Sequence, residues 1–234
     1  VHGASFQIVP TDTDGPLAAP VPLDRKICPE CLSDGLGKGP SRYAGYAWVS
    51  CANCGPRYSM IEQMPFDRER TSMRRFPMCQ ACATSYDHAA DRRFHAEGSS
   101  CAACGPRIWW TDRRGNEGDA DWRAVVRSAL LAGQIAAIRG VGGYQLLCDA
   151  TSRSAIERLR LRKRRPLKPL AVLVRDLCVA RRVAKLEDAE ESALLDSINP
   201  IVIVQARRPS ELASEFIHPG IDQIGILLPT SFLH

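Results

Sequence analysis

The chain has 234 residues, of which 45% are apolar and 24% charged, and its formal net charge is +5. This length allows one medium domain beside a smaller one, and the lack of a long apolar run excludes a membrane-spanning protein and predicts a soluble, globular one. The mild positive charge favours phosphate-bearing ligands but is too small to indicate nucleic-acid binding by itself.

The first residues read as the end of one domain followed by a linker. Residues 1–10 form one short apolar stretch that predicts a strand with nothing before it to pair with. We expect residues 1–15 to be the tail of a preceding domain. Residues 11–24 carry several prolines and aspartates, which is typical of a linker.

Eight of the ten cysteines form four Cys-x-x-Cys pairs. These are Cys28/Cys31, Cys51/Cys54, Cys79/Cys82 and Cys101/Cys104. Two such pairs about twenty residues apart are typical of a tetrathiolate zinc site, in which tight turns at the ends of a short β-ribbon aim four thiolates at one Zn²⁺ ion. Because the unit occurs twice, we predict a tandem zinc-ribbon module over residues 16–110 with two structural zinc ions. Its apolar content is thin, so metal should supply much of its folding free energy.

Other uses of these cysteines stay open, namely disulfides, an iron–sulfur cluster or redox dithiols. Evenly repeated pairs fit metal better than a disulfide framework, and nothing resembles a signal peptide. Pairing within each repeat is simpler, although spacing alone also permits cross-braced pairing. His95 lies near the last pair and is expected to be structural, since four thiolates already fill the site. Cys148 and Cys178 lie in apolar surroundings and are expected to be small buried side chains.

Short motifs accompany the two cysteine units. Gly55-Pro56-Arg57 and Gly105-Pro106-Arg107 follow the last cysteine of each unit, where glycine suits a tight turn and proline leads the chain out of it. Basic and aromatic residues lie between and within the units, in Pro65–Arg68, Thr71–Met73 and Asp91–His95. They would either contact RNA or pack the module, and we favour packing.

A polar linker over residues 111–120 ends the metal module, and helices and strands then alternate. We predict an α/β domain over residues 121–234 that lacks a closing element. Its first helix starts at Asp121 and ends at Gly133. The further expected elements are a strand at 135–138, a helix at 152–164, a strand at 170–174, helices at 176–184 and 188–196, a strand at 201–204 and an apolar run at 224–228.

Two features of this domain could bind an anion. The glycine turn Gly140-Val141-Gly142-Gly143 follows a strand and could bring backbone N–H groups against a phosphate, which alone is weak support. A dense group of cations lies along the second helix and the segment between it and the next strand. These cations form either a solvated helix face or an anion site. Its members are Arg153, Arg158, Arg160, Arg162, Lys163, Arg164, Arg165 and Lys168.

These motifs carry a resemblance to a known family. The tandem units with Cys-Gly-Pro-Arg knuckles, the Pro65–Arg68 connector and Asp91–Ala96 resemble the HypF-type carbamoyltransferases of nickel–iron hydrogenase maturation. The glycine turn with Tyr144 and the run Leu159–Pro169 are similar to the start of a YrdC-like nucleotide-binding domain. The fold class is therefore expected to be multidomain α+β and α/β, with an incomplete YrdC-like domain after the zinc-ribbon module.

The resemblance implies a reaction and its partners. Residues 1–15 would end an acylphosphatase-like domain. The YrdC-like domain would combine ATP, with Mg²⁺, and carbamate from carbamoyl phosphate into carbamoyl-adenylate. The carbamoyl group would then pass to the C-terminal cysteine of the partner HypE. We expect a cytoplasmic protein without a membrane partner.

The resemblance also implies the site. Lys163 and Arg165 match the Lys-x-Arg pair that binds nucleotide phosphates, with Lys168 beside them. The turn glycines, Gly140, Gly142 and Gly143, would frame the pocket, and the eight paired cysteines would be the metal ligands. No catalytic residue and no Mg²⁺ ligand is assigned.

The chain departs from the family pattern in three places. Pro40-Ser41-Arg42 replaces the acidic-Arg-Arg signature in the first repeat, and residues 228–234 differ from the family's Leu-Pro-Tyr-Thr-Pro-Leu-His. A Ser-Gly-Asn phosphate-contacting motif expected beyond His234 is absent. We therefore expect the 234 residues alone to be inactive.

Two rival functions remain. One is a threonylcarbamoyl-adenylate synthase for tRNA modification, against which the zinc repeats argue. The other is a non-enzymatic zinc module that binds RNA or a protein. Nucleic acid is not favoured as a partner but stays open, with double-stranded-RNA binding associated with this kind of fold as a side expectation.

Overall fold

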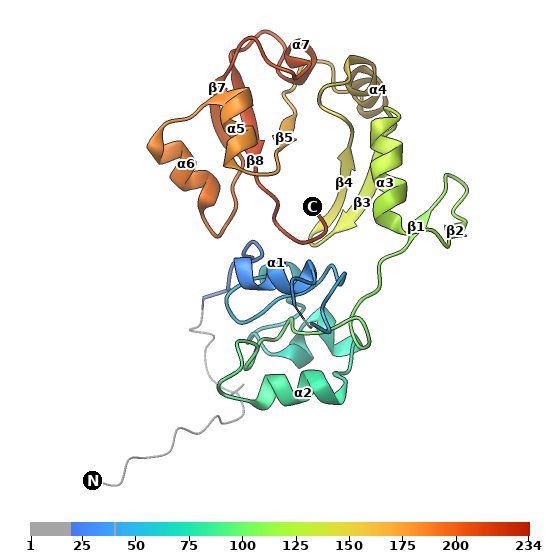
Figure 1. Ribbon diagram of the computed structural model, residues 1–234, viewed down its shortest axis with the longest axis vertical. Helices are drawn as coiled ribbons and strands as arrows, with labels where there is room; N and C mark the ends of the chain where they lie inside the picture. Colours follow the sequence, from blue (N-terminus) through green and yellow to red (C-terminus); the bar gives the residue numbers. More distant parts are fainter. Residues whose placement is uncertain (1–19, 40) are drawn as a thin grey trace.

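A computed structural model describes residues 20–39 and 41–234, and Figure 1 shows two parts joined by an extended segment. The lower part in this view contains α1 and α2, and the upper part contains the longer strands with the remaining α-helices. The strand predicted in residues 1–10 and the domain end predicted in residues 1–15 lie outside the described residues.

The cysteine-rich part has little regular structure beyond two short helices, α1 (Pro29–Gly35) and α2 (Gln80–Asp87). Each begins directly after the first cysteine of a repeat. In α1, Pro29 takes the first helical position, where its fixed φ is favourable and its missing N–H is not needed. The short β-ribbon expected between the paired cysteines is absent from the described residues, which show a helix and loops there instead.

Three short 3-10 helices complete this part: η1 (Tyr58–Met60), η2 (Arg68–Arg70) and η3 (Ser72–Arg75). Arg68 of the connector ties η2 to the second repeat, because its guanidinium donates to the carbonyl oxygens of Glu97 (2.6 Å), Ser99 (2.9 Å) and Phe76 (2.8 Å). The connector therefore packs the module, as the sequence analysis favoured.

The core of this part is built around the cysteines themselves. Their buried neighbours are Tyr43, Tyr46 and Val49. The hydroxyl of Tyr46 lies 2.8 Å from that of Ser100, which joins the two repeats inside the core. The apolar core is small, so its stability depends on whatever holds the sulfur atoms together.

A small hairpin occupies the segment that was expected to be a plain linker. It pairs β1 (Trp110–Thr111) with β2 (Glu117–Gly118) in antiparallel register. Asp112 accepts hydrogen bonds from the backbone N–H groups of Arg114 (2.7 Å) and Asn116 (2.9 Å), which is ordinary turn chemistry for aspartate.

The upper part starts with the predicted helix α3 (Trp122–Leu131), which the Asp121 side chain caps. Two strands follow, β3 (Ala136–Gly140) and the unpredicted β4 (Gly143–Leu147), and they pair as an antiparallel hairpin with Gly140 opposite Gly143. The glycine turn thus joins two strands. The basic helix α4 (Arg153–Lys163) comes next, capped by Ser152.

The second sheet has the strand order β5-β8-β7-β6. Only β5 and β8 run parallel, and the other two pairs are antiparallel. Its strands are β5 (Ala171–Leu173), β6 (Ala184–Lys185), β7 (Val202–Ala206) and β8 (Gln223–Leu227). The helices α5 (Leu177–Val183), α6 (Asp188–Leu195) and α7 (Ser214–Ile217) accompany it. Of these elements, β6 and α7 were not predicted.

The core of the upper part lies between this sheet and its helices. Ile156 of α4, Leu194 of α6 and Ile224 and Ile226 of β8 are at most 1% exposed. The apolar run expected at 224–228 largely coincides with β8, along which Ile224 and Ile226 are buried and their neighbours are more exposed.

The two parts meet at the segment after β8, which runs from the sheet toward α1 (Figure 1). The backbone N–H of Ile27 donates to the carbonyl of Thr230 at 2.8 Å. The Phe232 ring packs against the cysteine-rich core, so close to Gly35 that a Cβ there would lie 2.8 Å from the ring. Phe232, one of the departures from the family pattern, therefore helps to join the parts.

Replacing Phe232 by alanine should weaken this contact by about 2 kcal/mol, because the ring leaves a gap beside the cysteine-rich core. Limited proteolysis of the segment 111–120 measures the loosening, and we expect faster cleavage in Phe232→Ala. The control is Leu161→Ala, which removes a side chain that is 79% exposed. Equal cleavage rates in the two variants would contradict a docking role for Phe232.

Candidate metal centres and anion site

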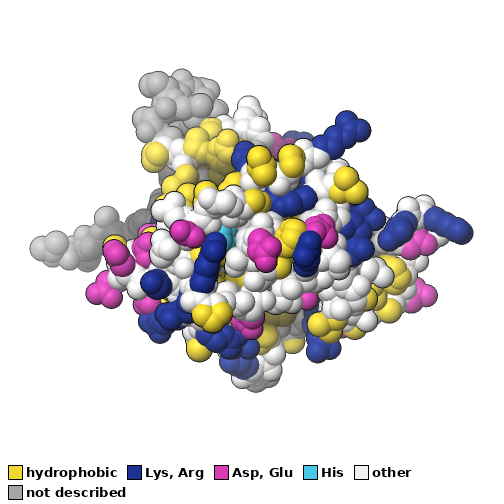
Figure 2. All heavy atoms as spheres, turned by 90° about the horizontal axis from the view of Figure 1, so that it is seen from above, with side chains coloured by type: hydrophobic (Ala, Val, Ile, Leu, Met, Phe, Trp, Pro, Cys, Tyr) yellow, Lys and Arg dark blue, Asp and Glu magenta, His cyan; other side chains and the backbone are white. Residues whose placement is uncertain are grey.

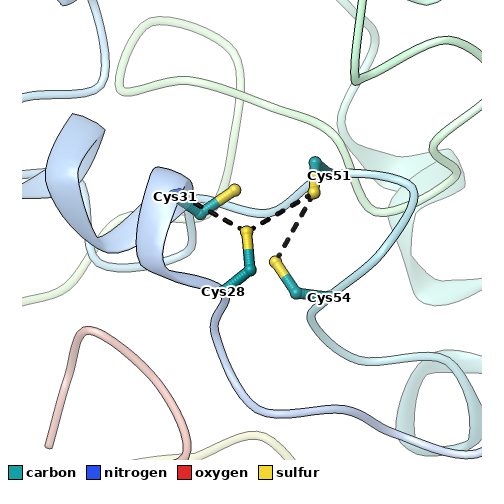
Figure 3. Close-up of side chains that lie close together, drawn as sticks. All are labelled: Cys28, Cys31, Cys51 and Cys54. Atoms are coloured by element: carbon teal, nitrogen blue, oxygen red, sulfur yellow. Dashed lines mark hydrogen bonds between the residues drawn. The ribbon is translucent and has the colours of Figure 1, made fainter. Parts of the chain in front are cut away.

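The four cysteines of the first repeat come together at one point (Figure 3). The Sγ atom of Cys51 lies 3.8 Å from the Sγ atom of Cys28 and 3.8 Å from that of Cys54. Cys31, Cys51 and Cys54 are buried, and Cys28 is partly buried. We call this set cluster 1.

The second repeat forms an equivalent group, cluster 2, from Cys79, Cys82, Cys101 and Cys104. The Sγ atom of Cys101 lies 3.8 Å from that of Cys79 and 3.9 Å from that of Cys104. The Sγ atoms of Cys104 and Cys82 are 3.6 Å apart. The sulfur atoms thus group within each repeat, and the structure does not show the cross-braced pairing that spacing alone left open.

Both clusters have the dimensions of a tetrathiolate metal site. A regular tetrahedron with metal–sulfur bonds of about 2.3 Å has edges of about 3.8 Å. A disulfide would need sulfur atoms about 2.05 Å apart, and all ten cysteines are free. Four thiolates in this geometry are the donor set that Zn²⁺ prefers, so the residues fit the ion that the sequence predicts.

Backbone N–H groups point at several of the sulfur atoms. Asn53 N lies 3.4 Å from Cys51 Sγ, and Cys31 N lies 3.5 Å from Cys28 Sγ. In cluster 2, Cys101 N lies 3.5 Å from Cys104 Sγ. Such groups favour the thiolate form that metal binding requires.

His95 and the two cysteines that were expected to be plain side chains lie outside both clusters. His95 packs its ring against Tyr86 and Phe94, with ring centroids 4.7 and 4.6 Å away, in keeping with a structural role. Cys148 is partly buried beside the core of the upper part. The expectation that Cys178 is buried was wrong, because it lies in the first turn of α5 and is exposed to solvent.

One residue of the basic run, Arg160, is buried and binds backbone carbonyl groups. Its side chain is buried, and only 8% of the residue is exposed. Its guanidinium donates to five carbonyl oxygens, those of Phe216, Ile217, Arg165, Pro166 and Lys168. Arg160 thereby fixes the loop 164–169 that follows α4. Sequence reasoning counted Arg160 as one more cation and did not separate it from its exposed neighbours.

The predicted phosphate-binding cations lie on and beside this loop. Lys163 is the last residue of α4 and is exposed, as is Lys168. Arg165 donates through Nη2 to the carbonyl of Pro169 at 2.8 Å, while its buried Nε has no partner among the described residues. The chain turns between them at Arg164, which has a positive φ of 50°.

The predicted glycines lie at the turn between β3 and β4. A Cβ at Gly142 would lie 3.5 Å from Ser59 Oγ of the cysteine-rich part, and one at Gly140 would lie 3.7 Å from Leu233. Gly142 has a φ of 81°, which suits the hairpin turn. That these glycines share one pocket with Lys163 remains a prediction.

Cations are spread over the surface of the upper part. Figure 2 shows Lys and Arg side chains interspersed with acidic and apolar ones on the face seen from above. Several arginines are paired with carboxylates, including Arg181 with Glu191 at 2.6 Å and Arg182 with Glu211 at 3.4 Å. A continuous basic surface of the kind that binds nucleic acid is not visible on this face. No helix among the described residues is long and apolar enough to cross a membrane.

Comparison with known proteins places both parts of the chain. The family model described as "HypF finger" matches residues 27–61 and 78–111, and the Sua5/YciO/YrdC model, described as "Telomere recombination", matches residues 128–234. The chain is 42% identical over 229 residues to the carbamoyltransferase HypF of Rhodobacter capsulatus, which covers 98% of this chain and 30% of that relative. It is 36% identical over 217 residues to the probable carbamoyltransferase HypF of Methanocaldococcus jannaschii, with coverages of 92% and 28%.

A solved structure agrees with the sequence comparison. The chain superposes on full-length HypF in its phosphate- and nucleotide-bound form with a TM-score of 0.83 and 37% identity, covering 92% of this chain and 28% of that one. It therefore spans about 30% of the length of the relatives it matches. With two HypF finger repeats followed by a YrdC-like α/β region, the chain is of the HypF type.

Proposed function

We propose that the chain contributes the metal-binding module and part of the nucleotide-binding region of a carbamoyltransferase of hydrogenase maturation. The observation that carries this proposal is the combination, in one HypF-type chain, of two four-cysteine clusters with the loop 164–169, which Arg160 holds in place. We call residues 163–169, with the cations Lys163, Arg165 and Lys168, the cationic loop. The relatives are named as carbamoyltransferases, and one solved relative binds phosphate and a nucleotide.

The proposed reaction activates a carbamoyl group with ATP. An oxygen of carbamate, derived from carbamoyl phosphate, forms a bond to the α-phosphorus of ATP while the bond from that phosphorus to the β-phosphate oxygen breaks. Carbamoyl-adenylate forms and pyrophosphate leaves. The carbamoyl group then passes to the C-terminal cysteine of HypE, in keeping with the resemblance described above.

The cationic loop supplies what this reaction needs most. Negative charge spreads over the phosphate oxygens as pyrophosphate leaves, so fixed cations accelerate the step by electrostatics and positioning. Lys163 and Arg165 would hold the phosphates, with Lys168 beside them. Because Arg160 binds the carbonyls of the loop, the cations are presented on a backbone that is already ordered. Mg²⁺ would accompany ATP and neutralise part of its charge.

We further propose a division of labour along the chain. Residues 16–110 would hold two structural Zn²⁺ ions through the eight clustered cysteines, residues 111–120 would connect, and residues 121–234 would belong to the nucleotide-binding domain. The contacts of Phe232 and Thr230 with the cysteine-rich part support a bracing role for the metal module.

Replacing Lys163 by alanine should lower carbamoyl-phosphate-dependent exchange of labelled pyrophosphate into ATP by about 10- to 100-fold, because a phosphate-binding cation is lost. The exchange is measured on the complete protein, with Arg127→Ala as the control, since Arg127 is an exposed cation on α3.

The same assay separates the proposal from its rivals. Exchange that is independent of Lys163 would contradict the assigned site. Activity with threonine and bicarbonate in place of carbamoyl phosphate would move the protein to tRNA modification. RNA binding that weakens with salt and survives replacement of Lys163 and Arg165 would point to a non-enzymatic RNA-binding module.

Removing the metal should unfold the cysteine-rich part while the β5-β8-β7-β6 sheet stays folded, because that part has only a small apolar core. Hydrogen exchange followed by peptide mapping, before and after treatment with a chelator, measures both regions at once. Metal analysis should give two zinc ions per chain and one in Cys31→Ser, while Cys178→Ser keeps both. Unchanged protection of residues 28–104 after complete metal removal would contradict a structural role for zinc.

A further inference from the structure

Besides Arg57 and Arg107, which follow the last cysteine of each repeat, the two repeats share a cation between their cysteine pairs. Arg42 and Arg92 hold the same place, nine residues before the third cysteine of their repeat. The two repeats also match within the helices, where Asp34 of α1 and Ser85 of α2 each lie six residues after the first cysteine. If the repeats were independent, each arginine would contact the cysteines of its own repeat. In the structure, each arginine contacts cysteines of the other repeat.

Arg92, from the second repeat, reaches the sulfur atoms of cluster 1. Its Nη1 lies 3.1 Å from the Sγ atom of Cys31 and 3.8 Å from that of Cys28. Its Nη2 donates to the Asp34 carboxylate, which lies on α1 of the first repeat. The side chains of Arg92 and Asp34 are both 29% exposed, so this contact is largely shielded from water.

Arg42, from the first repeat, makes the corresponding contacts with cluster 2. Its Nη2 lies 2.9 Å from Ser85 Oγ, 3.1 Å from the Ala81 carbonyl oxygen and 3.9 Å from Cys82 Sγ. Ser85 thus takes the part on α2 that Asp34 takes on α1. The guanidinium of Arg42 also lies 4.6 Å from the centre of the Tyr43 ring.

Asp34 and Tyr43 also bind a second arginine, Arg93, near cluster 1. Arg93 donates to Asp34 at 2.6 Å and stacks on the Tyr43 ring at 3.8 Å from its centre. Partial burial alone would raise the pKa of Asp34, but the hydrogen bonds from Arg93 and Arg92 outweigh it and hold this pKa below its ordinary value. A carboxylate that stays charged can keep both guanidinium groups in place.

The charge of the metal sites explains why such cations matter. Four thiolates and one Zn²⁺ ion carry a net charge of about −2, and each site is partly buried. A guanidinium that donates to a thiolate offsets this charge and fixes the orientation of the ligand, as partners beyond the ligands commonly do in metal sites. The shorter contact, 3.1 Å for Arg92 against 3.9 Å for Arg42, gives Arg92 the larger effect.

We propose that the repeats exchange arginines, with Arg92 of the second repeat stabilising the metal site of cluster 1 and Arg42 of the first repeat stabilising that of cluster 2. Neither repeat then completes its own site. Counted from the third cysteine, Ser41 and Tyr43 stand where the second repeat has Asp91 and Arg93, so Arg42 is the one residue of this signature that both repeats contain.

The test measures zinc retention at each cluster separately. The zinc-loaded protein is exposed to increasing concentrations of a chelator, released cysteines are alkylated, and peptide mapping assigns them to cluster 1 or cluster 2. Arg92→Ala should weaken zinc retention by cluster 1 about 10- to 100-fold and change cluster 2 less. Arg42→Ala should weaken cluster 2 more than cluster 1, by a smaller factor.

Two controls keep the result interpretable. Arg113→Ala removes an exposed cation of the β1–β2 hairpin and should change neither cluster. Arg92→Lys keeps the charge but loses the planar group that contacts sulfur and carboxylate together, so cluster 1 should lose zinc at an intermediate chelator concentration.

Three results would overturn the proposal. The first is that each arginine variant weakens the cluster of its own repeat at least as much as the opposite one. The second is that Arg113→Ala matches the effect of Arg92→Ala. The third is that neither Arg92→Ala nor Arg92→Lys changes zinc retention by cluster 1.

Discussion

The structure of the cysteine-rich part depends on keeping four sulfur atoms about 3.8 Å apart at two points. Thiolates at this spacing repel one another unless a cation lies between them, and the geometry fits Zn²⁺. Three kinds of neighbour surround the clusters. The helices α1 and α2 begin at the first cysteine of each repeat, a few aromatic side chains fill the remaining core, and arginines approach the sulfur atoms from outside.

This arrangement extends to the upper part of the molecule. Phe232 packs on the cysteine-rich core, and the backbone after β8 binds the chain just before Cys28, so cluster 1 lies directly beside the contact between the parts. The cationic loop is held differently, because the buried Arg160 donates hydrogen bonds to carbonyl oxygens of the loop and of the end of α7. The segment 164–169 has no helix or strand of its own, so the hydrogen bonds from Arg160 take the place of regular structure there.

Sequence reasoning found the two sulfur clusters because Cys-x-x-Cys spacing fixes local geometry whatever the rest of the fold does. It also found α3, where a cap and apolar periodicity agree, and α4, and it marked most of β8 as an apolar run without assigning a strand. It missed α1, although Pro29 directly after a cysteine was an available signal. It could not find the exchanged arginines or the buried Arg160, because charge in a sequence does not reveal which cation is turned inward. Cys178 was misplaced because an apolar stretch of sequence does not reveal which of its side chains face solvent.

The most direct test of the account is X-ray absorption spectroscopy at the zinc edge of the purified protein, combined with metal analysis. The account predicts two zinc ions per chain, each with four sulfur neighbours at about 2.3 Å and no nitrogen or oxygen neighbour. A mixed sulfur and nitrogen environment, or a metal-free folded protein with cysteine disulfides, would contradict it.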